Sequence, residues 1–333
     1  MEIVRAEHLT DGQWKSYARL CNAIDKKSDP GTQYDWKIIK MERLLDMETL
    51  KEDHLTCYLF LENGEAIGWA GMRLLGADAE FMYYALDKVP AEVMKVLFEI
   101  ILNFIAEHGK NEILSASKEE SIVGSFKKAG AEILDRRIFA RLYKNDIDKK
   151  ELQKIVDGVS EKTNYELKLY DTISEEILDK YVDVYNDARV DMNTNNPNER
   201  IIEKRNREDV LKKLKWDKGP DDKMFVYALM DNENLAAYCS LFIRVENKHM
   251  VDQAGGLTTV ARNYRGKNLA RFLKAKMYLK MLEEYPDFEF IRTDTYPWNT
   301  YMYKINEEMG FKPYEIYTEI KLSKSQIEKF LQT

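Results

Sequence analysis

Hydrophobic and polar positions follow two periods along the chain, and the resulting order of elements occurs twice. Runs rich in β-branched and aromatic residues, such as 57–61 and 224–230, are typical of strands. Segments such as 91–108 carry apolar residues at the spacing of a helix. These patterns predict the order β-α-α-β-β-β-α-β-α-β in residues 1–145, and the same order again from Asn164. The repetition indicates duplication. The predicted fold class is α/β (α+β), with two domains that each contain a largely antiparallel sheet.

The expected domain boundaries follow from the same pattern. Residues 1–145 form the first domain and residues 164–333 the second. Between them, 146–163 is polar and rich in Lys, Asp and Glu, which predicts a helical or irregular linker. In the second half we expect a turn-rich loop at 191–200, and one continuous strand at 250–260.

Composition and charge narrow the class of protein. The 333 residues are 44% hydrophobic and 33% charged, as in soluble globular proteins. A net charge of −7 argues against a nucleic-acid partner, because no basic stripe is present to neutralise phosphates. The polar N-terminus and the lack of a long apolar run predict a cytoplasmic protein without a membrane partner. Three scattered cysteines and four histidines lack ligand-like spacing, so we expect free thiols and no metal.

One stretch of the second half has the composition of an anion site. Residues 258–270, TTVARNYRGKNLA, lead from a strand through a glycine-containing turn into a helix that continues to Glu284. The first turn of a helix leaves backbone N–H groups unpaired, and its dipole favours negative charge. Arg265 and Lys267 add fixed positive charge. The stretch is therefore a candidate pyrophosphate site, although, taken alone, it is better explained as a plain turn with a basic helix start.

A second motif gives this turn a family context. Residues 265–270, RGKNLA, resemble the R/Q-x-x-G-x-G/A turn of the GNAT superfamily of acetyl-CoA-dependent N-acetyltransferases, with Asn268 where glycine is usual. Asn tolerates the left-handed conformation better than most residues do. The stretch TDTYPWNTYMYKINEEMGF resembles a further GNAT motif through Asn299, Met302 and Gly310-Phe311. The doubled element order resembles that of tandem GNAT proteins, in which two acyl-CoA N-acyltransferase domains follow one another.

The resemblance implies acetyl-CoA as cosubstrate, with no metal. Its pyrophosphate would lie on the turn and its pantetheine arm in a V-shaped opening beside the preceding strand. The implied acceptor is a primary amine of a small molecule or peptide, which attacks the thioester directly, in a monomer or homodimer. The implied cofactor-binding residues are Thr258, Thr259, Val260, Arg265, Gly266, Lys267, Asn268, Leu269, Ala270, Asn299, Met302 and Asn306.

The catalytic base and acid are less clear from the sequence. Asp252 is the only carboxylate on the predicted central strand, which makes it a candidate base, but a hydrogen-bonded strand carboxylate is the commoner role. Glu246 and Glu315 are weaker candidates, and water alone is the remaining alternative.

Many GNAT enzymes place an acid tyrosine four residues before the glycine that ends the last helix. Here that position is Asn306, which cannot act as an acid. Tyr303 lies one helical turn away and is the candidate acid, with Tyr301 and Tyr296 as neighbours that otherwise serve as packing residues.

The first half lacks the turn motif. Residues 83–91 contain no Arg-Gly pair, and Pro90 removes one backbone donor. We therefore expect residues 1–145 to be a degenerate GNAT-like domain without acetyl-CoA. This degeneracy, together with Asn268 and Asn306, leaves a second hypothesis open: a non-catalytic protein that binds or senses acyl-CoA.

Overall fold

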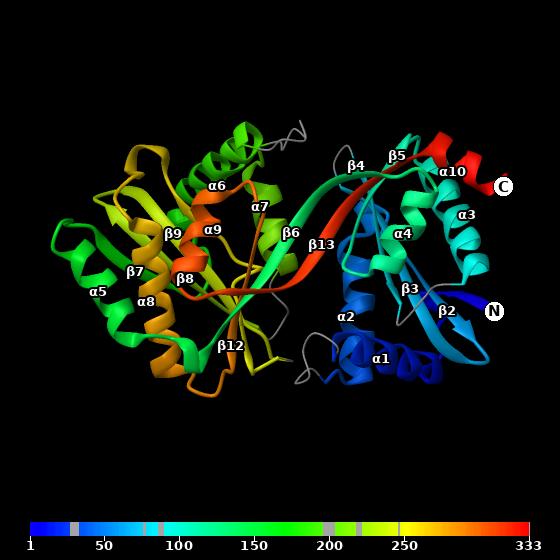
Figure 1. Cartoon of the computed structure of the whole chain (residues 1–333), viewed down its shortest axis with the longest axis horizontal. Helices are drawn as coiled ribbons and strands as arrows, with labels where there is room; N and C mark the ends of the chain where they lie inside the picture. The colour runs from blue at the N-terminus through cyan, green and yellow to red at the C-terminus, as the bar shows by residue number, and fades with distance from the viewer. Residues whose placement is uncertain are drawn as a thin grey trace. The chain divides into compact units, whose positions relative to one another are not determined.

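The computed structural model describes residues 1–26, 33–75, 78–85, 90–195, 204–217, 222–245 and 247–332. The chain forms two compact units (Figure 1). Unit 1 comprises residues 1–137 and 315–333, and unit 2 comprises residues 138–314.

Unit 1 contains a sheet with helices on both faces. Its elements are β1 (Glu2–Arg5), α1 (Asp11–Asp25), α2 (Trp36–Thr49), β2 (Thr56–Glu62), β3 (Glu65–Leu75), β4 (Asp78–Ala85), α3 (Ala91–Glu107), β5 (Glu112–Ser117), α4 (Glu120–Lys128), the first half of β6 (Glu132–Tyr143), most of β13 (Lys312–Ser323) and α10 (Lys324–Leu331). The strand order is β1-β2-β3-β4-β5-β13, and β4 and β5 are parallel. Helices α3, α4 and α10 cover one face, and α1 and α2 the other.

Unit 2 repeats this arrangement. Its elements are the second half of β6, α5 (Lys149–Ser160), β7 (Glu166–Tyr170), α6 (Glu175–Asn195), α7 (Arg207–Asp217), β8 (Lys223–Asp231), β9 (Asn234–Ile243), β10 (Met250–Asp252), β11 (Thr258–Val260), α8 (Leu269–Glu284), β12 (Phe290–Thr295), α9 (Thr300–Glu308) and the start of β13. The strand order is β6-β12-β10-β9-β8-β7, with β11 paired to β9. Helices α5 and α8 pack on one face, and α6 and α7 on the other (Figure 1).

The bounds of the compact units differ from the domain boundaries expected at 145 and 164. Strand β6 begins in unit 1, and its residues 138–143 pair with β12 in unit 2. Strand β13 begins in unit 2, and its residues 318–323 pair with β5 in unit 1. The chain thus returns to unit 1 for its last strand and helix. The alternation of apolar and polar residues along a strand predicts which face is buried, but it does not predict which neighbouring strand it pairs with.

The segment expected as a linker is part of the core of unit 2. Asp148 caps α5 by accepting hydrogen bonds from the backbone N–H groups of Lys150 and Glu151. The apolar stripe of α5, Leu152, Val156 and Val159, is buried in the same cluster as α8. Residues 149–160 are therefore a structural helix.

Two elements of unit 2 have other bounds than the sequence predicts. Helix α6 continues to Asn195, so the loop expected at 191–200 begins later, and 196–203 lies outside the described residues. The single strand expected at 250–260 is interrupted, and its two ends are β10 and β11. Within the described part of the chain, no helix is long and apolar enough to span a bilayer.

Candidate functional site

Two neighbouring strands of unit 2 separate where the predicted strand 250–260 is interrupted. Strand β10 pairs in parallel with β12, and the backbone N–H of Gln253 donates a further hydrogen bond to Arg292 O at 2.8 Å. Beyond this bond the chain turns toward β9, where Gly256 passes so close that a Cβ would lie 2.1 Å from Ser240 O. Among the described strands β11 then pairs with β9 only. The edge of β11 away from β9 is therefore left without a strand partner.

The pairing of β11 determines which of its backbone groups face this open edge. Leu257 O accepts a hydrogen bond from Ser240 N, and Ala261 N donates one to Ala236 O, so these two residues face β9. Backbone groups alternate in direction along an antiparallel strand. The groups of Thr258 and Val260 consequently point away from β9. Both residues were expected to offer their backbone to the cofactor.

The turn after β11 has the backbone conformation expected of an anion-binding loop. Gly266 adopts φ +78° and Asn268 φ +60°, both in the left-handed region, and α8 begins at Leu269. Asn268 stands where glycine is usual in the GNAT turn, and its left-handed conformation is one that asparagine tolerates. A Cβ at Gly266 would meet nothing within 4 Å, so this position opens onto free space. The first N–H groups of α8 have no partner within their own helix.

The side chains of the turn are held by neighbours in unit 2. Arg265 forms an ion pair with Asp191 of α6, and its Nε donates to Val260 O at 3.2 Å. Lys267 donates to the Tyr165 hydroxyl at 2.8 Å. Leu269 is buried in the core, so only its backbone is available for binding. The turn therefore presents Lys267 and an Arg265 that is paired with Asp191 beside backbone donors.

Helix α9 places the residues of the second motif. Asn299 is its N-cap and accepts a hydrogen bond from the backbone N–H of Met302 at 3.3 Å. Tyr301 is 85% exposed, whereas Tyr303 and Met302 are half-buried. Tyr296 stacks on Trp298 with 4.9 Å between ring centroids. Asn299 thus has a local structural role in addition to the role implied by the resemblance.

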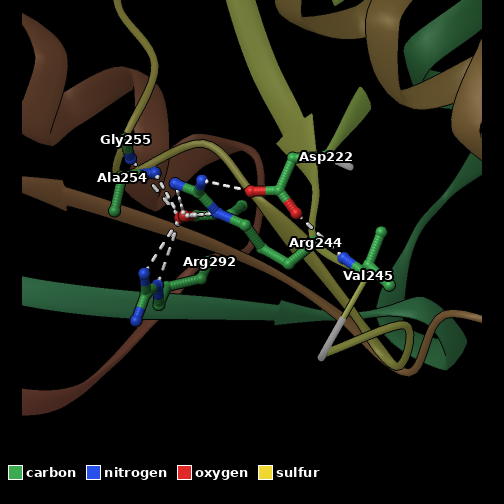
Figure 2. A network of polar contacts seen from close by, with 7 residues as sticks. Asp222, Arg244, Val245, Ala254, Gly255 and Arg292 are labelled. Carbon is green, nitrogen blue, oxygen red and sulfur yellow. Dashed lines mark hydrogen bonds and ion pairs between the residues drawn. The ribbon is translucent and has the colours of Figure 1, made fainter. Parts of the chain in front are cut away.

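The buried Asp252 forms ion pairs with Arg244 and Arg292, which are labelled in Figure 2. Its Oδ2 accepts hydrogen bonds from Arg244 Nε and Nη2 at 3.0 and 2.8 Å, and its Oδ1 accepts from Arg292 Nε and Nη2 at 3.2 and 3.1 Å. The N–H groups of Ala254 and Gly255 also donate to Oδ1. Arg244 in turn binds Asp222 at 2.8 Å.

This environment makes the Asp252 carboxylate a weak base. Burial alone would raise its pKa, but the charges and hydrogen bonds of Arg292 and Arg244 outweigh burial and lower the pKa. The group resembles the hydrogen-bonded strand carboxylate more than a base. Of the weaker candidates, Glu315 belongs to unit 1 and forms an ion pair with Lys118 at 2.9 Å, and Glu246 lies outside the described residues.

A buried lysine beside the separated strands was not predicted. Lys274 of α8 is 1% exposed, and its Nζ donates to Gln253 Oε1 and to Asn306 Oδ1, both at 2.8 Å. Gln253 Oε1 also accepts a hydrogen bond from the Tyr278 hydroxyl. A signal is present in the sequence, because Lys274 shares the spacing of the apolar residues Met277, Tyr278 and Met281 on one helix face.

Solved structures with the same architecture cover almost the whole chain. A tandem GNAT protein from the clavulanic acid biosynthesis pathway superposes with a TM-score of 0.72 at 14% identity, over 97% of this chain and 99% of that one. The chain has the tandem GNAT fold. A GCN5-related N-acetyltransferase from Sphaerobacter thermophilus gives a TM-score of 0.63 at 11% identity, over 97% and 96% of the two chains. A GNAT-family acetyltransferase from Colwellia psychrerythraea gives 0.50 at 12% identity, over 97% and 99%.

The tandem GNAT fold is supported by structure rather than by sequence similarity. No protein-family model matches the chain, and no curated protein matches it. The comparisons thus agree with the fold implied by the motifs at 265–270 and 299–311. Of the corresponding junction in unit 1, residues 86–89 lie outside the described part.

Proposed function

We propose that unit 2 is an acetyl-CoA-dependent N-acetyltransferase that transfers acetyl to a primary amine of a small molecule or peptide by direct attack on the thioester. The observation that carries this proposal is the separation of β11 from β12 directly before the left-handed turn at Gly266 and Asn268. An open strand edge followed by an anion-binding helix start suits a ligand with an amide-containing arm and a pyrophosphate.

The chemistry of the site fits the parts of acetyl-CoA. The outward backbone groups of Thr258 and the N–H of Val260 would pair with the amides of the pantetheine arm, as in strand addition, whereas Val260 O already accepts a hydrogen bond from Arg265 Nε. The N–H groups of Leu269 and Ala270, with Arg265 and Lys267, would hold the pyrophosphate. On β12, the hydroxyl of Thr295 is buried without a hydrogen-bond partner in the described structure, and a bound ligand would supply one.

We propose fewer side chains for proton transfer than the sequence suggests. The lowered pKa of Asp252 leaves water, rather than this carboxylate, as the proposed acceptor of the amine proton. Tyr303, the tyrosine expected as acid, is half-buried on α9 one turn from Asn299, and the buried Lys274 offers a second proton donor beside the separated strands. Unit 1 is proposed to bind no acetyl-CoA.

Calorimetric titration with acetyl-CoA followed by a thiol-release assay over a panel of amines tests the proposal. We expect one equivalent bound per chain and turnover with at least one amine. A second equivalent would contradict the assignment of unit 1, and no binding would contradict the site in unit 2.

Binding without turnover on any amine would favour the alternative of an acyl-CoA-binding or sensing protein. The buried ion pairs of Asp252 are the structural feature that favours this alternative, because they remove the carboxylate of β10 from base chemistry.

A further inference from the structure

Lys274 is a buried cation whose hydrogen-bond partners are neutral. Both acceptors, Gln253 Oε1 and Asn306 Oδ1, are amide oxygens, and no ion pair to Lys274 is found among the described residues. Burial lowers the pKa of Lys274 to about 8. The charges of Cys239 and Asp294 act in the opposite direction to burial and raise the pKa of Lys274. An ammonium in such a place is poorly compensated, and a nearby negative charge would stabilise it.

The ammonium lies at the closed end of the separation between β11 and β12. Its partner Gln253 is also the residue whose N–H makes the last backbone bond to β12. Gln253 Nε2 and Thr258 Oγ1 both donate to the buried Cys239 Sγ, at 3.1 and 3.3 Å, so the cluster continues to the first residue of β11. Asn306 connects the same cluster to α9. Lys274 is thus placed where an occupant of the open edge would end.

We infer that Lys274 is the acid that protonates the sulfur of CoA as it leaves, an inference that rests on the proposed N-acetyltransferase function. During acyl transfer negative charge develops on the carbonyl oxygen of the tetrahedral intermediate and on the sulfur, and of these two atoms only the sulfur leaves as an anion that needs a proton. Asn306 and Gln253 hold the lysine in position by accepting hydrogen bonds from its ammonium, which leaves one N–H that would donate to the sulfur.

The step balances in atoms and charge. The acceptor amine attacks the thioester carbonyl, a C–N bond forms, and the C–S bond breaks. The proton of Lys274 Nζ passes to the sulfur and gives the free thiol. The nitrogen of the product loses its extra proton to water, and Lys274 regains a proton from solvent. Because its pKa is about 8, most of the lysine is protonated at neutral pH and available as acid.

The test uses the product CoA and needs no acceptor. An ammonium beside the sulfur lowers the pKa of the bound thiol below the value of about 8.5 for an unperturbed thiol, by about one unit or more. We propose to titrate the ultraviolet absorbance of the thiolate in the CoA complex of the full chain. The complex with desulfo-CoA serves as the blank, because it cancels the protein's own thiols. A bound thiol with an unshifted or raised pKa would overturn the inference even if every variant failed to fold.

Matched variants assign the shift to this lysine. Lys274→Met keeps the length of the side chain and should return the thiol pKa to about 8.5. Lys276→Met removes the same charge from a half-buried position of the same helix and should leave the shift unchanged. If Tyr303→Phe abolished the shift and Lys274→Met did not, Tyr303 would be the acid and the inference would be wrong.

Different results would contradict this inference and the proposed function. CoA that binds with a thiol unaffected by Lys274→Met contradicts this inference alone. Failure of both CoA and acetyl-CoA to bind contradicts the proposed function.

Discussion

The carboxylate of Asp252 and the guanidinium of Arg292 meet through two hydrogen bonds of 3.1 and 3.2 Å, across parallel strands β10 and β12. Asp252 is 1% exposed, so the pair is shielded from water on the carboxylate side. Breaking a buried ion pair by removing one partner leaves the other charge uncompensated and typically costs about 3–5 kcal/mol.

The first prediction concerns Asp252→Asn. We expect a lower free energy of unfolding by about 3 kcal/mol, measured by urea denaturation. Asp222→Asn, which leaves Asp252 between its two arginines, should cost less. A change below about 0.5 kcal/mol for Asp252→Asn would show that the network contributes little.

The second prediction concerns pH. The pKa of Asp252 is lower in the folded state than in the unfolded chain, so its contribution to stability is complete above the unfolded value of about 3.9. That contribution is lost as pH falls through the folded pKa. The difference in Tm between wild type and Asp252→Asn should therefore be constant from neutral pH to about pH 5 and shrink below it. A difference that changes between neutral pH and about pH 5 would mean that Asp252 titrates there as a base.

The third prediction concerns Gly266→Val. A Cβ at Gly266 would meet nothing within 4 Å, and a side chain there would enter the space proposed for the pyrophosphate. Valine is also strained at the φ of +78° of this residue, a strain that Gly109→Val shares. We expect acetyl-CoA affinity to fall by a factor of about 100 or more, which corresponds to about 2.7 kcal/mol. Gly109→Val is a matched control, because Gly109 also has a positive φ and nothing within 4 Å, and it lies in unit 1. Similar affinity in wild type and Gly266→Val would show that the turn does not bind the ligand.

The fourth prediction concerns Asn268, whose φ is +60°. Asn268→Gly should retain acetyl-CoA binding, because glycine adopts the left-handed region without strain. Asn268→Val should lower stability or affinity by about 1–2 kcal/mol, because a β-branched residue is strained there. Calorimetry and thermal unfolding of both variants measure this difference. Equal behaviour of the two variants would mean that the conformation at 268 is not needed.

The fifth prediction concerns α5. Leu152→Ala should reduce the free energy of unfolding by about 2–5 kcal/mol, because Leu152 is buried in the cluster shared with α8. Lys154→Ala on the exposed side of α5 should change it by less than about 0.5 kcal/mol. If Leu152→Ala were also neutral, residues 149–160 would behave as the linker that their polar composition suggests.

The sequence predicts those features of the fold that depend on local chemistry. The sequence predicts Thr10 or Asp11 as the N-cap of the first helix, and Thr10 caps α1 through a capping box with Gln13. The hairpin of β2 and β3 turns at Asn63 and Gly64, both with positive φ. The left-handed turn at Asn268 follows from the motif and from the tolerance of asparagine for that conformation.

Features that depend on distant neighbours were not predictable in this way. Asp252 was a candidate base because it is the only carboxylate on the predicted strand 250–260. Its environment, however, is set by Arg292, 40 residues away. The interruption of strand 250–260 depends on the close approach of Gly256 to Ser240. Lys274 has two acceptors, Gln253 and Asn306, that only tertiary packing brings together. Local periodicity contains no information about such partners.

The return of β13 to unit 1 also has a consequence for how the protein folds during synthesis. Unit 2 is a continuous segment, residues 138–314, and can complete its sheet as soon as that segment has emerged. Unit 1 pairs β5 with residues 318–323 and packs Ile327 of α10 into its core, so its sheet stays open until those residues are translated. Translation of unit 1 thus begins before that of unit 2, but the sheet of unit 1 is completed after that of unit 2. Chaperones would encounter unit 1 with one edge of its sheet exposed.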